Sequence, residues 1–146
     1  SSKVRTDHKF AWVKGTDTET DTPLINIPAA NFTNSITYTI PKWNNFLVSL
    51  ESQYVFEQTR FPDNIEVFSP EQQENVILDI NTPPDAYHLL SFNTEASFTL
   101  KNKNDLTVGL TASNLLNTNY RDYLNRQRYF VDDMGRNISL RLIFNY

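Results

Sequence analysis

The sequence predicts an all-β chain of antiparallel strands that belongs to a transmembrane β-barrel. Three observations favour this fold class. Apolar and polar residues alternate with a period of two through most of the chain, which is the spacing of side chains along a β-strand. Short and long connections alternate between these segments. Each segment is close to the length of about 9–11 residues with which a tilted strand crosses hydrocarbon.

The composition excludes several other classes. The 146 residues contain 13 Lys and Arg against 17 Asp and Glu, so there is no basic stripe that could neutralise nucleic-acid phosphates. The chain has no cysteine, and therefore no disulfide framework or thiolate metal site. No run approaches the roughly 18 apolar residues of a transmembrane helix, and the first residues lack the pattern of a signal peptide. With only three glycines, asparagine is expected to form many of the turns.

The first half of the chain contains three expected strands. The first covers residues 4–14. Residues 32–40 and 46–56 form a hairpin around a tight turn at Pro41–Asn45, because apolar and polar residues alternate on both sides of it.

The second half contains three more. Residues 90–100 and 106–113 form a hairpin around the polar turn Lys101–Asp105. Residues 137–146 are the clearest strand, and Ile143 is its one exception to strict alternation. Its apolar face consists of Ile138, Leu140, Leu142, Phe144 and Tyr146.

Three long connections remain, at residues 15–30, 57–87 and 117–136, and we expect them to lack regular structure. Membrane barrels have short periplasmic turns at one rim, long extracellular loops at the other, and strands with a lipid face and a watery face. Aromatic residues gather near strand ends, as in interfacial girdles. They are Trp43, Phe46, Phe98, Phe144 and Tyr146 at the short-turn rim, and Trp12, Phe32, Tyr54, Phe56 and Phe92 at the long-loop rim. A half-exposed sheet of a soluble β-sandwich has the same alternation and stays open as the alternative.

Several motifs carry a resemblance. The C-terminal part reads N-L-L-N-T-N-Y at 114–120, Y-L-N-R at 123–126, R-Y-F at 128–130 and G-R-N at 135–137, followed by the alternating strand. Upstream are G-T-D at 15–17, P-L-I-N-I-P at 23–28 and Q-T-R at 58–60. With these motifs, nearly the whole chain resembles the C-terminal part of TonB-dependent receptors of Gram-negative outer membranes.

The resemblance implies a barrel of about 22 strands closed by an N-terminal plug, of which residues 1–146 would supply about six C-terminal strands. Six strands cannot close such a barrel, so the outer strands would pair with preceding strands of the same receptor. The implied partners are those strands, the plug, the TonB energy-coupling complex acting through the plug, the barrel-assembly machinery and outer-membrane lipid. The implied activity is import of a scarce nutrient such as an iron–siderophore, haem, cobalamin, metal or glycan, without catalysis or a cofactor.

Candidate ligand contacts lie in the last long loop, where arginines and aromatic residues are interleaved: Arg121, Tyr123, Arg126, Arg128 and Tyr129. The planar guanidinium donors of arginine suit an anionic iron chelate. The alternative is that these side chains bridge loops or are simply solvated.

The remaining candidates are dispersed. Glu51, Glu95 and Arg141 are expected to face the lumen, with carboxylates paired to arginine, because no nucleophile or base accompanies them. His8 and His88 lie in different hairpins and lack further metal ligands, although Asp85 is near His88 in sequence. The resemblance implies that Phe144 and Tyr146 signal barrel assembly. A soluble binding or adhesin-like surface module and an outer-membrane enzyme are the other function classes.

Overall fold

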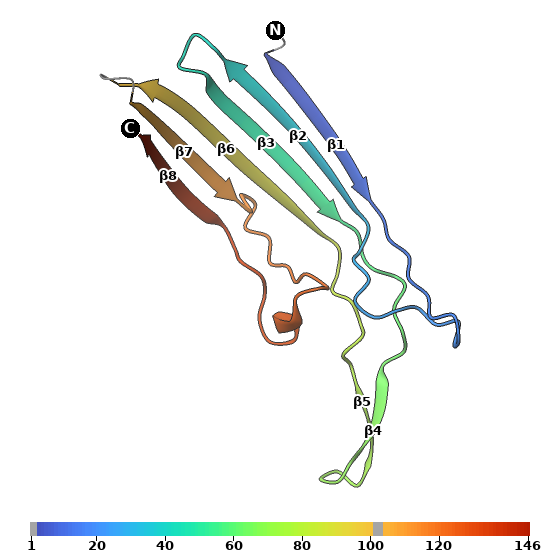
Figure 1. The fold of residues 1–146 in the computed structure, drawn as a ribbon. Helices are drawn as coiled ribbons and strands as arrows, with labels where there is room; N and C mark the ends of the chain where they lie inside the picture. Colours follow the sequence, from blue (N-terminus) through green and yellow to red (C-terminus); the bar gives the residue numbers. More distant parts are fainter. Residues whose placement is uncertain (1–2, 101–103) are drawn as a thin grey trace.

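The computed structural model describes residues 3–100 and 104–146. Its main feature is one antiparallel sheet with the strand order β1-β2-β3-β6-β7-β8 (Figure 1). The bounds of these strands are β1 Val4–Ala11, β2 Asn31–Ile40, β3 Phe46–Val55, β6 Tyr87–Thr99, β7 Asp105–Ser113 and β8 Asn137–Asn145. The all-β class and the six antiparallel strands expected from the sequence are thereby confirmed.

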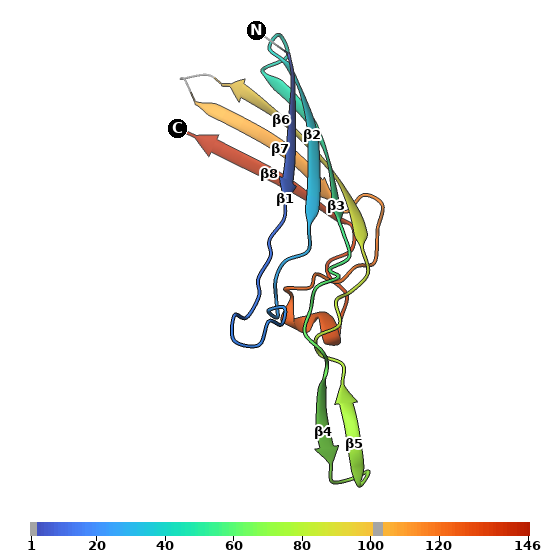
Figure 2. The ribbon, with the colours of Figure 1, turned by 90° about the vertical axis from the view of Figure 1, so that its right-hand side faces the viewer.

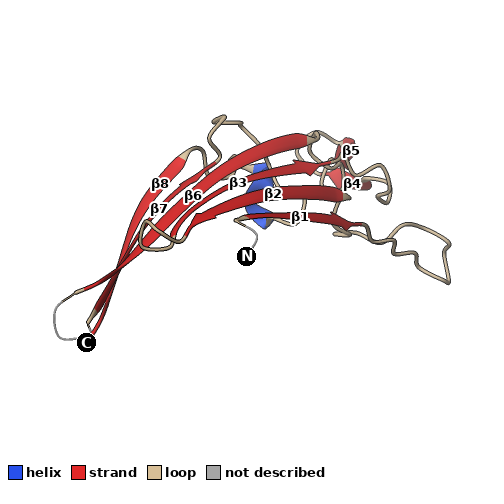
Figure 3. Cartoon of the chain, turned by 90° about the horizontal axis from the view of Figure 1, so that it is seen from above, coloured by secondary structure: helices blue, strands red, loops and turns tan. Residues whose placement is uncertain are grey.

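The sheet is open. β1 and β8 are its two edges, and each pairs with one neighbour among the described residues. The strands bend together, so that the sheet is curved when seen from above (Figure 3). Within residues 3–100 and 104–146, no helix has the length and apolar character needed to cross a membrane.

The long connection expected to lack structure at residues 57–87 contains a second hairpin. β4 (Ile65–Ser69) and β5 (Glu74–Leu78) pair with each other and project away from the main sheet (Figure 2). Each of these strands has only five residues. The alternation expected of a membrane-spanning strand runs over about 9–11 residues, so it does not predict them. The last long connection also contains a short 3₁₀ helix at Arg126–Tyr129.

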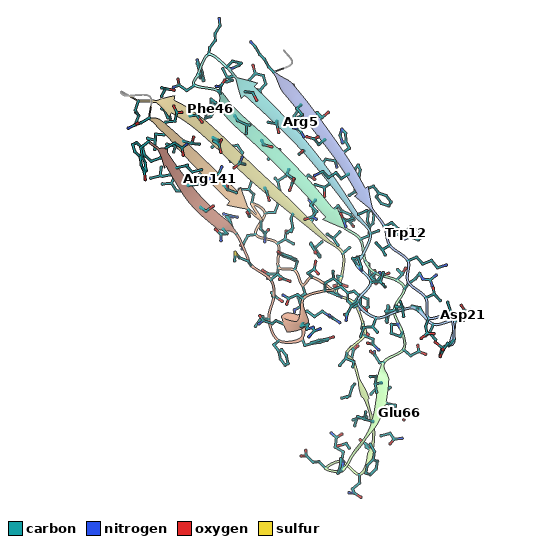
Figure 4. All side chains as sticks on the ribbon, viewed as in Figure 1. Arg5, Trp12, Asp21, Phe46, Glu66 and Arg141 are labelled. Carbon is teal, nitrogen blue, oxygen red and sulfur yellow. The ribbon has the colours of Figure 1, made fainter. Side chains whose placement is uncertain are left out.

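Two strand boundaries differ from the expectation. β1 ends at Ala11 rather than at residue 14, and β6 begins at Tyr87 rather than at residue 90. Phe92 therefore lies in the middle of β6, opposite Leu50 and Ala112, and not at the long-loop rim. Figure 4 marks Phe46 at the short-turn end of β3 and Trp12 beyond the loop end of β1, as the aromatic pattern predicts.

Asparagine does supply most of the unusual turn conformations. Seven non-glycine residues in the described chain have positive φ, and five of them are asparagine. Asn44 and Asn45, at φ 55° and 54°, close the β2–β3 turn, because asparagine tolerates this left-handed region better than most side chains. The expected turn at Lys101–Asp105 falls largely on residues 101–103, outside the described residues. Beside it, the Leu100 N–H donates to the Asn104 carbonyl at 2.7 Å.

The register gives the sheet two chemically different faces. Odd-numbered residues from all six strands share one face, and even-numbered residues share the other. One row of the odd face, hereafter the polar face, consists of Arg5, Thr37, Ser49, Asn93, Thr111 and Ser139. The adjacent row of the even face, hereafter the apolar face, consists of Thr6, Ile36, Leu50, Phe92, Ala112 and Ile138.

Little of the apolar face is buried. The hydrophobic residues counted as buried in the described chain are only Tyr87, Ala112 and Tyr123. On β8, Ile138, Leu140 and Leu142 are 67%, 66% and 64% exposed. No second layer of the described chain covers this face.

Candidate binding site at the loop end of the polar face

All three long connections leave the same end of the sheet (Figure 1), and their packing begins with Asn114 at the end of β7. The buried Asn114 side chain accepts from the Thr118 N–H at 2.9 Å and donates to the Thr118 carbonyl at 2.9 Å. Asn117 accepts from the Arg136 N–H at 3.0 Å, and a side chain at Gly135 would approach its Oδ1 to 3.2 Å. The N-L-L-N and G-R-N motifs therefore contact each other.

The upstream motifs also meet. A Cβ on Gly15 would lie 2.7 Å from Ile27 Cδ1, so glycine is needed for this close approach. Gln58 donates to the carbonyls of Ile27 and Pro28 at 2.9 and 3.2 Å. Asp17 accepts from the N–H groups of two following residues, and these hydrogen bonds hold its pKa below the usual value. The motif residues thus order the first long loop against the second.

Arg128 holds the last long loop together. Its guanidinium lies 4.6 Å from the ring centroid of Tyr123 and 4.4 Å from that of Tyr129. It donates to the carbonyls of Tyr123 and Ile80, and Tyr129 Oη also donates to Ile80 at 2.6 Å. Tyr123 Oη donates to the Asn81 carbonyl at 3.2 Å. We call this group the Arg128 clamp, and it fastens the loop to the base of the β4–β5 hairpin.

The expected ligand contacts are therefore divided between two roles. Arg128 and Tyr123 are 6% and 5% exposed and contribute to packing, although Tyr123 also lines the cavity described below. The Arg121 guanidinium forms an ion pair with Asp132 at 2.6 Å and donates a hydrogen bond to the Arg128 carbonyl at 2.8 Å. Arg126 is exposed, and a contact between it and an anionic ligand stays a prediction.

A cavity of ≈ 440 Å³ lies where the polar face meets the last long loop. Its sheet wall comes from the loop ends of β2, β3 and β6, and the rest of its lining comes from residues 28–29, 120, 122–124 and 133. The lining residues are Pro28, Ala29, Asn31, Gln53, Val55, Tyr87, Leu89, Tyr120, Asp122, Tyr123, Leu124 and Asp133. The lining thus combines three tyrosine rings with two carboxylates and contains no basic side chain.

Hydrogen bonds hold the two carboxylates in place. Asp122 accepts from Tyr87 Oη at 2.9 Å and from the Leu124 N–H at 2.7 Å. Asp133 accepts from the Asp122 N–H at 2.7 Å and from the Asn125 side-chain amide at 2.8 Å. In the described chain, neither forms an ion pair.

Tyr120 supplies an aromatic wall of the cavity beside Asp122 and Asp133. Its ring centroid lies 4.6 Å from that of Tyr87. Burial raises the pKa of Tyr120, and the negative charges of Asp133 and Asp122 raise it further. The cavity wall is consequently acidic and suits a ligand that donates hydrogen bonds or carries positive charge.

Away from the cavity, the polar face contains one cross-strand ion pair. Arg141 on β8 donates to Glu95 on β6, passing over Gly109 of the intervening strand. Glu51 lies on the same face but in another hollow, with Ser91, Asn93 and Thr111. Phe144 and Tyr146 are exposed, with ring centroids 6.4 Å apart.

The two histidines lie on the apolar face and each has a hydrogen-bond partner there. His8 pairs with Asn34 at 2.7 Å, and His88 pairs with Ser52 at 2.8 Å. Residues 3–100 and 104–146 contain no group of three or more His, Cys, Asp or Glu side chains placed to hold a metal ion.

Tyr87, Asp122 and Asp133 are site residues that the sequence pattern does not single out. The alternation breaks at Leu89, which places an apolar side chain on the polar face, so the sequence pattern does not extend β6 to Tyr87. No local signal marks Asp133 either, because its partner Asp122 lies on the opposite limb of the loop. Comparison with protein-family models, curated proteins and solved structures found no match.

Proposed function

We propose that this chain is the C-terminal part of a TonB-dependent receptor barrel in the outer membrane of a Gram-negative bacterium. In this role it takes part in binding a scarce nutrient and importing it with TonB-coupled energy. The proposal assigns transport rather than catalysis to the chain. Its six-stranded sheet would be a segment of a barrel wall with about 22 strands.

The observation that carries the proposal is the uncovered apolar face. Side chains such as Leu140 and Leu142 are about two-thirds exposed, while the opposite face has polar residues in every strand. Removing such apolar surface from water is worth roughly 25 cal/mol per Å², so a face of this size favours contact with an apolar medium. Lipid on one side and a watery lumen on the other account for both faces.

Two further features support it. The long connections share one end of the sheet, and the β2–β3 turn lies at the other together with the end of β6 and the start of β7, as do extracellular loops and periplasmic turns in such barrels. The open edges of β1 and β8 would pair with the remaining strands of the same receptor, because unpaired backbone groups are costly in lipid.

The remaining partners follow from the same proposal. The plug domain would fill the lumen beside Glu51 and Glu95, and TonB would act through it. The barrel-assembly machinery would recognise the aromatic side chains of Phe144 and Tyr146. Nutrient would first meet the long loops, where the cavity beside Asp122 and Asp133 is available.

The alternative, a soluble sandwich used for binding or adhesion, needs a second sheet over the apolar face. One experiment separates the two. The full-length protein should be extracted from cell envelopes only by detergent, and it should migrate differently on a gel before and after heating. Extraction by buffer alone, with no effect of heating on migration, would contradict the barrel proposal.

A further inference from the structure

The cavity beside Asp122 and Asp133 has an unbalanced charge. These two carboxylates are the only charged groups in its lining, and no Lys, Arg or His side chain lines it. Each of their four oxygens accepts one hydrogen bond from the protein and keeps capacity for a second. Two neighbouring carboxylates in a partly enclosed space repel each other, so a positive charge between them is stabilised.

The aromatic wall suits the same ligand. The rings of Tyr87 and Tyr120 pack together at this wall, and ring faces attract cations. Pro28 and Leu89 supply aliphatic surface beside them, which an organic ligand can cover.

The same loop already holds one cationic group, the guanidinium of its own Arg128, against tyrosine rings. Arg128 is nearly buried between Tyr123 and Tyr129, and its hydrogen-bond acceptors are backbone carbonyls rather than carboxylates. Tyrosine rings and backbone carbonyls therefore hold a guanidinium in this loop, although its buried Nε has no hydrogen-bond partner within the described residues. The cavity offers tyrosine rings together with two carboxylates.

We propose that this cavity binds the ammonium or guanidinium group of a small organic cation, held by Asp122 and Asp133 against the rings of Tyr87 and Tyr120. The inference depends on the proposed function only for the idea that the ligand is a captured nutrient. It differs from the anionic chelate expected from the loop arginines, since Arg121 and Arg128 are engaged within the protein.

The test uses isothermal titration calorimetry on the full-length protein with three probes of similar shape. Phenethylammonium is cationic, 2-phenylethanol is neutral and phenylacetate is anionic. Charge-assisted hydrogen bonds contribute more than neutral ones, so phenethylammonium should bind about tenfold more tightly than 2-phenylethanol. Phenylacetate should not bind.

Variants assign the binding to this cavity. Asp133→Asn keeps an oxygen acceptor for the loop and removes the charge, and it should weaken phenethylammonium binding about tenfold or more. Glu51→Gln removes a carboxylate of the same face outside the cavity and should leave binding unchanged. Tyr120→Leu should weaken binding of the cation more than Tyr120→Phe, because it removes the ring.

Three results would overturn the inference: equal affinity for the cationic and neutral probes, preference for phenylacetate, or equal effects of Asp133→Asn and Glu51→Gln. A fourth result would also overturn it: the unmodified protein binds none of the three probes, and Asp133→Asn greatly lowers its thermal stability. The partner of Asp133 would then be a cationic side chain from another segment of the full-length protein rather than a small ligand. The barrel proposal is judged separately by detergent extraction and heat-dependent migration, so either can fail alone.

Discussion

Arg141 on β8 reaches Glu95 on β6 across a whole intervening strand, and its guanidinium passes over Gly109 of that strand. The three residues form one row of the polar face, and the Arg141 guanidinium lies over the glycine, 3.5 Å from where a Cβ would be. A Cβ at this distance makes ordinary van der Waals contact, so alanine would fit here, whereas a larger branched side chain would fill the path between the two charges.

A double-mutant cycle with Glu95→Gln and Arg141→Gln measures this relationship. Both side chains are substantially exposed, at 34% and 59%, so we expect a coupling energy of only about 0.2–1 kcal/mol. In a Gly109→Val background, the branched side chain would occupy the path and the coupling should vanish. Urea unfolding of the reconstituted protein provides the free energies. An undiminished coupling in the valine background would show that glycine is not required.

The two faces predict opposite responses to arginine. Leu110 and Leu140 are directly opposite each other on the apolar face, and Thr111 and Ser139 form the adjacent pair on the polar face. Leu110→Arg or Leu140→Arg should cost about 2–4 kcal/mol in a lipid bilayer, whereas Thr111→Arg or Ser139→Arg should be tolerated. The free energy of unfolding in lipid checks this. Equal sensitivity of both faces would indicate a sheet buried on both sides.

The barrel proposal predicts which of the loops and turns lie outside the cell. The chain contains no cysteine, so single cysteines can be introduced and labelled without background from the chain. Thr18→Cys and Gln72→Cys, in two long connections, should react with a membrane-impermeant maleimide on intact cells. Lys42→Cys, in the short β2–β3 turn, should react only after the outer membrane is permeabilised. Labelling of Lys42→Cys on intact cells would reverse the topology.

The Arg128 clamp predicts local rather than global effects. Arg128→Ala removes two ring contacts and two hydrogen bonds to carbonyls, and should lower the free energy of opening of this loop by roughly 2–4 kcal/mol. Hydrogen exchange of the amides at residues 123–131 should then accelerate. Arg126→Ala, in the same 3₁₀ helix but exposed, is the matched control and should leave exchange unchanged. Equal acceleration in both variants would contradict the clamp.

The strands and faces were accessible from the sequence because their cause is local. In a strand, successive side chains point to opposite sides, so the alternation Ile138, Leu140, Leu142 predicts both the strand and its apolar face. Likewise, Asn44 and Asn45 predict a tight turn from the conformations that asparagine tolerates. The closure of a barrel concerns strands beyond these six and stays a prediction.

Only the tertiary structure decided which loop residues meet. Arg128 bonds to the carbonyl of Ile80, a partner 48 residues away, and Tyr87 bonds to Asp122 across 35 residues. A periodic pattern specifies the direction of a side chain relative to its own strand, but not the partner that folding brings to it. For that reason the interleaved arginines and tyrosines were predicted as a ligand surface, whereas Arg128 packs inside the loop and two aspartates line the cavity.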